Sequence, residues 1–302
     1  MKKFIIKIGI FFLVVLVFDI ASGKAFSYML DHAKGGDNKR NNYICNETNE
    51  DILIFGSSRA FRHYNPIIIS DSLGLSCYNC GQLGNGIVSN YGLYQLLCQR
   101  YHPRILIYDV MPKYDLQAGE DHHKYLGLLR AYYDRNGISE VFESVDNVEK
   151  YKMLSQMYRY NSIFTQIVLD FIHRSKREGI KGFIPHNKEM DTLKVNNHSK
   201  EITEIVYDPL KIEYINKMLD ASKDTKVIFV VSPFWYGLDT TSLAYVKTIC
   251  QQRKLHFIDY SNNPKYVHHN EFFKDGMHLN ARGADEFTKD LVVEFQKRQV
   301  LE

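Results

Sequence analysis

Short apolar runs alternate with amphipathic stretches in the first part of the chain. Buried strands are predicted at 51–56, 76–81 and 104–110, where DILIFG, SCYNCG and RILIYDV are bounded by turn residues. Helical spacing follows the first two strands, at 65–74 and 89–102. The first of these helices is opened by a proline and closed by a glycine, which are the usual start and stop signals.

The same alternation returns after residue 208. A helix at 209–222 precedes a strand at 226–233, a helix at 241–254 precedes a strand at 256–261, and a last helix is predicted from Ala281 to about Arg298. Strands separated by helices at this spacing form parallel pairs through right-handed crossovers. We therefore predict an α/β fold, a five-stranded parallel sheet with helices on both faces.

The alternation pauses between about residues 112 and 208. This interval is rich in tyrosine and charged residues, with a helical pattern at 161–177 and a polar, loop-like stretch at 186–201. We interpret it as an insertion that forms a helical cap over the carboxyl edge of the sheet, where open α/β sheets bind ligands. Its tyrosines have two interpretations, stacking on sugar rings or, more commonly at helical spacing, packing in a core.

The N-terminus has lysines followed by an unbroken apolar run from Ile8 to Phe18, the pattern of an export signal. Residues 1–23 are predicted to be an uncleaved single-pass anchor, with the body outside the cytoplasm because lysines hold the short end inside. Cleavage after the small residues 21–23 is the alternative. Residues 24–50 are predicted to be a flexible tether, and residues 51–302 the folded domain.

Composition and charge exclude several classes of function. The chain has 302 residues, 45% of them hydrophobic, which suits one large α/β domain. Its net charge of +3 is small and its basic residues form no stripe, so no nucleic-acid partner is expected. GxGxxG and P-loop patterns do not occur, so no nucleotide cofactor is expected. Cys77 and Cys80 face opposite sides of a predicted strand, which favours buried thiols over a disulfide.

Two serines follow the first predicted strand directly, in Gly56-Ser57-Ser58. One interpretation is a glycine turn and a serine that caps the next helix. The other is a serine nucleophile held at the sheet edge, which requires a histidine and an acid from elsewhere in the chain. Asp275 and His278 suit those roles, because three-residue spacing lets the carboxylate hold one ring nitrogen while the other faces outward.

A glycine-rich segment, NCGQLGNG at 79–86, follows the second strand. Its glycines permit close approach of the backbone to a ligand. The amide of Gly84, with that of Ser58 at a helix N-terminus, would then bind a developing oxyanion. Taken alone, this segment is an ordinary turn.

In this order the segments resemble the blocks of the SGNH (GDSL-type) hydrolase superfamily, at residues 56–58, 79–84 and 275–279. Ser57 stands where the usual Gly-Asp-Ser block has an aspartate. The resemblance implies a flavodoxin-like three-layer sandwich, no cofactor and a catalytic triad. By that resemblance the triad consists of Ser58 as nucleophile, His278 as base and Asp275 as the orienting acid.

One departure from the family pattern concerns the oxyanion hole. The family's third block supplies an asparagine after the third strand, whereas this chain has Asp109 in IYDVMPKYD. An anionic carboxylate aimed at an oxyanion would repel it, so Asp109 either points elsewhere, stays protonated or binds another group. Asn85, beside Gly84, is the candidate substitute donor.

The altered block, the anchor and the GSSR sequence are similar to a membrane-anchored branch of the superfamily that modifies cell-envelope polymers. This likeness implies a serine esterase or O-acyltransferase acting on an envelope glycan from the periplasmic side of a bacterial inner membrane. Envelope polysaccharide machinery would be its partner. The alternative is a non-catalytic protein that binds glycan or an assembly partner in the same cleft.

Two histidine pairs, at 122–123 and 268–269, raise the question of a metal. Neither pair has a spaced partner that completes a ligand set, and adjacent histidines do not readily face one ion. Solvated loops are the expected explanation, and no metal site is predicted.

Overall fold

A computed structural model describes residues 1–175, 179–190 and 205–300. The chain forms two compact units, residues 46–121 with 179–302, and residues 1–45 with 122–178. We call the first the sheet unit and the second the helical unit. The insertion predicted at 112–208 is therefore narrower than expected, because residues 112–121 and those from 179 onward belong to the sheet unit. Part of the loop predicted at 186–201 lies outside the described residues.

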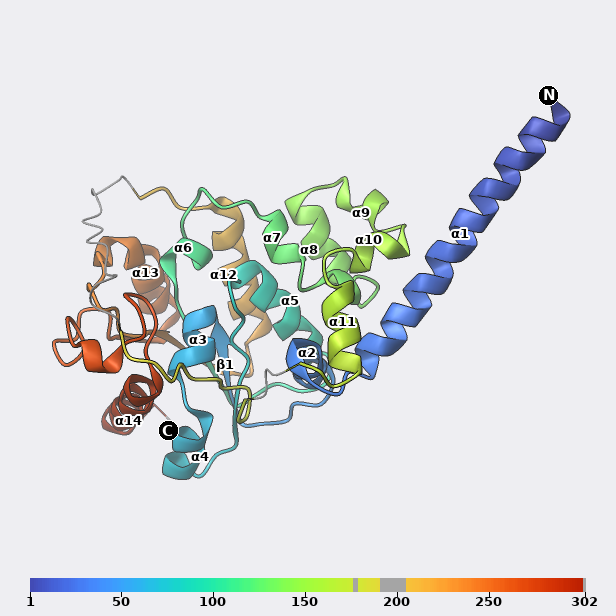
Figure 1. Ribbon diagram of the computed structural model, residues 1–302. Helices are drawn as coiled ribbons and strands as arrows, with labels where there is room; N and C mark the ends of the chain where they lie inside the picture. Colours follow the sequence, from blue (N-terminus) through green and yellow to red (C-terminus); the bar gives the residue numbers. More distant parts are fainter. Residues whose placement is uncertain (176–178, 191–204, 301–302) are drawn as a thin grey trace. The chain divides into compact units, whose positions relative to one another are not determined.

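The sheet unit contains the predicted five-stranded parallel sheet (Figure 1). Its spatial order is β2-β1-β3-β4-β5, the flavodoxin-like order, and neighbouring strands are parallel. The strands are β1 (Ile52–Gly56), β2 (Cys77–Asn79), β3 (Ile105–Asp109), β4 (Lys226–Val231) and β5 (His256–Asp259).

Helices of the sheet unit follow the strands in the predicted alternation. They are α3 (Ser58–His63), α4 (Pro66–Leu73), α5 (Ile87–Cys98), α6 (Pro112–Asp115), α12 (Pro209–Ala221), α13 (Ala244–Arg253) and α14 (Ala281–Lys297), with short 3-10 turns η3 (Thr240–Leu243) and η4 (Asn270–Phe272). Every residue of β1 and of β3 is buried, as expected for strands of a parallel sheet that is covered on both faces.

Side chains alternate between the two faces of the sheet. Ile52 and Ile54 point to the face where Tyr64 and Phe287 pack, so α3 and α14 cover it. Phe55 points the other way and meets Tyr94 of α5 edge-on. On that second face α5 packs against α12. The result is the predicted three-layer arrangement.

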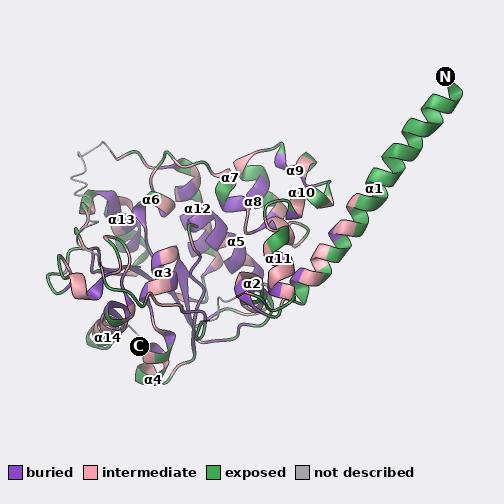
Figure 2. Ribbon diagram, in the orientation of Figure 1, coloured by how far each residue is buried: buried purple, intermediate pink, exposed green. Residues whose placement is uncertain are grey.

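The helical unit contains α1 (Lys2–Asp31), α2 (Gly36–Asn46), and the short helices α7 (His123–Leu126), α8 (Ile138–Val145), α9 (Glu149–Lys152), α10 (Gln156–Tyr160) and α11 (Phe164–Phe171), with the 3-10 turn η1 (Arg130–Tyr132). Among the described residues α1 is the one helix long and apolar enough to cross a membrane. Its first half is exposed (Figure 2), whereas Gly23 and Leu30 in its second half are buried.

The prediction of a flexible tether at 24–50 is wrong. α1 continues to Asp31 and α2 occupies Gly36–Asn46. The polar residues of this stretch are held by specific hydrogen bonds: Asn42 Nδ2 donates to Leu30 O at 2.5 Å, and Asn38 donates twice to Asp170. A composition typical of solvated linkers therefore encodes a polar contact surface inside the helical unit.

Candidate active site

The turn after β1 accounts for one of the two serines. Gly56 has φ +142°, and a Cβ there would lie 2.7 Å from Asp109 O, so glycine is required. Ser57 is the N-cap of α3, and its Oγ accepts the Arg59 amide at 3.3 Å. Ser57 thus fulfils the capping interpretation, and Ser58 is left as the first residue of the helix.

Ser58, His278 and Asp275 form one chain of hydrogen bonds. Ser58 Oγ lies 2.8 Å from His278 Nε2, and His278 Nδ1 lies 3.0 and 3.1 Å from the two Asp275 oxygens. Since a carboxylate only accepts, the ring proton belongs on Nδ1, and Nε2 is left to accept the serine proton. This is the order that a Ser-His-Asp relay requires.

The loop that carries Asp275 and His278 is held closed at its base. Lys274 N donates to His278 O at 2.8 Å, and Phe273 and Leu279 form an antiparallel bridge. Inside the loop, Asp275 Oδ1 accepts the Met277 and His278 amides, each at 2.9 Å. Burial alone would raise the pKa of Asp275, but His278 and these amides outweigh it and lower that pKa to about 2.

The Asp109 carboxylate lies in a buried network. Its Oδ1 accepts the Tyr64 hydroxyl at 2.5 Å and the Ser232 amide at 3.0 Å, while Oδ2 lies 3.9 Å from Arg59 Nε. Burial raises the pKa of Asp109, and the Arg59 charge opposes that rise. Of the interpretations left open by the sequence, the structure supports the one in which this carboxylate binds other groups.

The candidate oxyanion donors come from two segments. Ser58 is the first residue of α3, so its amide has no intrahelical acceptor. Gly84 has φ +68° in the turn between β2 and α5, a conformation that suits glycine. The Asn85 side chain also takes part in this turn: Nδ2 donates to Leu83 O, and Oδ1 accepts the Ser89 hydroxyl. These bonds use one of its two amide protons, and the donor set of Ser58, Gly84 and Asn85 stays a prediction.

Four further residues, which the sequence motifs did not indicate, lie around the hydrogen-bonded Ser58 and His278. His63 and Arg59 lie on α3, Ser232 follows β4, and the His186 ring lies 5.8 Å from that of His278. Burial lowers the pKa of His186 to about 4, so this ring is neutral at pH 7. Position alone could have indicated Arg59 and Ser232, since both directly follow the carboxyl end of a strand or its capping turn.

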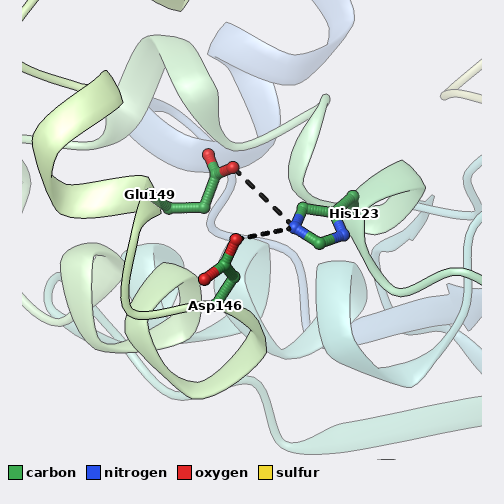
Figure 3. Close-up of side chains that lie close together, drawn as sticks. All are labelled: His123, Asp146 and Glu149. Carbon is green, nitrogen blue, oxygen red and sulfur yellow. Dashed lines mark hydrogen bonds and ion pairs between the residues drawn. The ribbon is translucent and has the colours of Figure 1, made fainter.

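The helical unit holds a cluster of ligand-type side chains, His123, Asp146 and Glu149, whose candidate ligand atoms lie within 4.8 Å of one another (Figure 3). Sequence spacing did not indicate it because the carboxylates follow the histidine by more than twenty residues. Lys152 Nζ lies 2.7 Å from Glu149 Oε1 and 3.7 Å from Asp146 Oδ2. The Lys152 ammonium group therefore already pairs with both carboxylates, and we interpret the cluster as an ion-pair network.

Among solved structures, the chain is similar to a family two carbohydrate esterase from Clostridium thermocellum in complex with cellohexaose, with 10% sequence identity and a TM-score of 0.39. It is also similar to the acetyl xylan esterase Est2A from the rumen bacterium Butyrivibrio proteoclasticus, with 8% identity and a TM-score of 0.36. Each match covers 82% of this chain and 64% of the other. A likeness of this degree identifies neither substrate nor mechanism. No family model and no curated protein matches the chain.

Proposed function

We propose that this protein is a membrane-anchored serine esterase or O-acyltransferase that acts on acyl esters of a cell-envelope glycan. One observation carries the proposal, the unbroken chain from Ser58 Oγ through His278 to Asp275. This chain joins two segments that are distant in sequence, the turn after β1 and the loop of Asp275 and His278. In parallel α/β sheets, active sites lie at the carboxyl edge, where β1 ends. The Asp109 carboxylate is held by Tyr64 and Ser232, and the charge of Arg59 beside it offsets its own.

The reaction follows from the positions of the protons. Ser58 Oγ attacks the acyl carbonyl as its proton passes to His278 Nε2, and Asp275 stabilises the resulting imidazolium. The Ser58 and Gly84 amides hold the negative oxygen of the tetrahedral intermediate. Its collapse breaks the ester bond, and His278 returns the proton to the leaving sugar hydroxyl. Water or a second hydroxyl then attacks the acyl carbonyl as its proton passes to His278. The bond between the acyl carbon and Ser58 Oγ breaks, and His278 returns the proton to Oγ.

The anchor is supported by the way α1 divides at Asp19. Apolar side chains before Asp19 are exposed, whereas Asp19 itself accepts the amides of Gln156 and Met157, each at 2.8 Å. The small residues 21–23 of the alternative cleavage site lie in the helix beyond that point, and Gly23 packs against Gln156. We expect mature protein from the membrane fraction to retain residues 1–23, as intact-mass measurement would show.

Turnover of p-nitrophenyl acetate by the full-length protein tests the activity. Ser58→Ala and His278→Ala are expected to abolish turnover without altering the circular dichroism spectrum. Ser57→Ala is the matched control, because it removes a capping hydroxyl one residue away and is expected to keep most of the activity. Equal turnover by Ser58→Ala and the wild type would refute the proposal.

A further inference from the structure

We infer that Arg59 and His63 are positioning residues for this reaction, which clamp the loop carrying His278 onto the helix that carries Ser58. The inference rests on the proposed function. It assigns a role to the two α3 side chains that contact the backbone on either side of the catalytic histidine.

Arg59 and His63, which we call the clamp, hold the two residues that flank His278 in the chain. Arg59 Nη1 donates to Met277 O at 2.6 Å, and the Leu279 amide donates to His63 Nε2 at 3.0 Å. Residues 277 and 279 therefore have fixed backbones, and the His278 side chain between them has little freedom to leave Ser58. Ser58 starts the same six-residue helix, so nucleophile, clamp and base belong to one rigid assembly.

The hydrogen bonds of His63 determine its tautomer. Its Nε2 accepts the Leu279 amide, so its proton lies on Nδ1, which donates to Ser232 Oγ at 2.9 Å. The side chain is fully buried, and burial together with the Arg59 charge lowers the pKa of His63 well below 6.5. A neutral ring is the form that can accept from Leu279, and this environment maintains it.

The other side of the Arg59 guanidinium is held by several hydrogen bonds and an aromatic ring. Nη2 donates to Ser232 O, Ser232 Oγ and Pro233 O at 2.5, 2.8 and 3.0 Å, and the guanidinium lies 3.6 Å from the centre of the Phe234 ring. Its exposure is only 1%. Burying a charge is costly, so a structural contact that an apolar side chain could make does not explain it. Fixing carbonyls in a plane is what the guanidinium fork does best.

Ser232 joins both arms of the clamp, and Asp109 completes it. Ser232 Oγ receives hydrogen bonds from Arg59 and His63, while the Ser232 amide donates to Asp109 Oδ1. Asp109 also supplies the negative charge nearest Arg59. Asp109 therefore serves as the counter-ion of Arg59. This role explains why an acid follows the third strand in a chain that has an arginine directly after Ser58.

Steady-state kinetics on a short acyl ester, with the full-length protein, test the inference. Displacing a catalytic group by about 1 Å costs roughly 100-fold in rate. We expect Arg59→Met and His63→Leu each to lower kcat by about that factor with KM nearly unchanged, since both side chains are buried from solvent. His63→Gln offers an acceptor near the position of Nε2 and is expected to recover most of the loss.

Arg62→Met is the matched control. Arg62 lies on the same helix, and its Nη1 donates to Ile184 O at 2.7 Å. Its kcat is expected to stay within about twofold of wild type. Equal kcat values for His63→Leu, Arg62→Met and the wild type would overturn the clamp while leaving the triad intact. An inactive wild type would instead refute the proposed function.

A second measurement does not depend on variant folding. In the wild-type protein, a through-hydrogen-bond coupling between the Leu279 amide nitrogen and His63 Nε2, together with a protonated Nδ1, is the expected NMR signature. A His63 ring protonated at Nε2 would overturn the inference, since that ring could not accept from Leu279.

Discussion

Replacing Asp109 by asparagine separates the effect of its charge from that of its hydrogen bonds. Asn Oδ1 can still accept the Tyr64 hydroxyl and the Ser232 amide, so those contacts survive. What is lost is the negative charge 3.9 Å from Arg59 Nε, where both side chains are buried. At an effective dielectric constant of about 20, that pair interacts by about 4 kcal/mol.

Leaving a buried charge without its partner typically costs about 3 to 5 kcal/mol, so Asp109→Asn is expected to lower the free energy of unfolding by about 3 to 4 kcal/mol. Arg59→Met leaves the carboxylate uncompensated and is expected to cost a similar amount. The double variant removes both charges together. It is expected to be more stable than the sum of the single losses by about 2 kcal/mol or more.

Urea unfolding followed by tryptophan fluorescence measures all four proteins. The chain has a single tryptophan, Trp235, next to the Phe234 ring that covers Arg59, so its signal reports on this network in the sheet unit. Losses that add to within about 0.5 kcal/mol in the double variant would show that Arg59 and Asp109 are not coupled. Asp109 would then not be the counter-ion of Arg59.

Three further predictions concern pH, catalysis and the turn. Burial raises the pKa of Asp115 to about 7, so the folded state holds a proton that the unfolded state releases near 3.8. The free energy of unfolding of the wild type should therefore fall as the pH rises from 5 to 7, by up to about 2 to 3 kcal/mol. Asp115→Asn should not show this fall in urea titrations. Asp275→Asn should reduce kcat on the acyl ester by about 10³- to 10⁴-fold at pH 7 through loss of the correct tautomer, and a tenfold effect or less would contradict the assigned orientation. Gly56→Ala should destabilise the protein by at least about 2 kcal/mol, because the new Cβ would meet Asp109 O. Gly74→Ala is the control: Gly74 has φ +66° and open space around it, so the change should cost only about 1 kcal/mol. Equal losses in thermal or urea unfolding would argue against the close contact at Gly56.

The sheet was predictable because its strands are short apolar runs, rich in Ile and Val, that are bounded by turn residues and alternate with helical patterns. The terminal helix, predicted from Ala281 to about Arg298, ends at Lys297. Its start was readable because Asn280 is an N-cap that accepts the Gly283 amide. Local chemistry fixed these elements, so a single sequence was enough.

Residues whose partners are distant were not predictable in the same way. Asn38 and Asn42 are polar and suggest a solvated tether, but their partners Asp170 and Leu30 hold them in a folded unit. The sequence leaves three interpretations of Asp109 open, and the positions of Tyr64 and Ser232 favour the one in which its carboxylate binds other groups. Buried polar groups are decided by where their partners lie, and hydrophobic periodicity carries no information on that.

The division of the molecule was missed for a related reason. The interval from 112 to 208 has one continuous character in composition, yet residues 122–178 group with the N-terminal helices while its ends belong to the sheet unit. Composition marks where an alternation stops. It does not mark which hydrophobic core the intervening helices join.

Activation of Ser58 by His278 is the central claim, and labelling with a fluorophosphonate probe followed by peptide mapping tests it most directly. The wild-type protein is expected to carry the probe on Ser58, to retain labelling in Ser57→Ala and to lose it in His278→Ala. An unlabelled wild-type protein, or labelling of Ser58 that persists without His278, would contradict the claim.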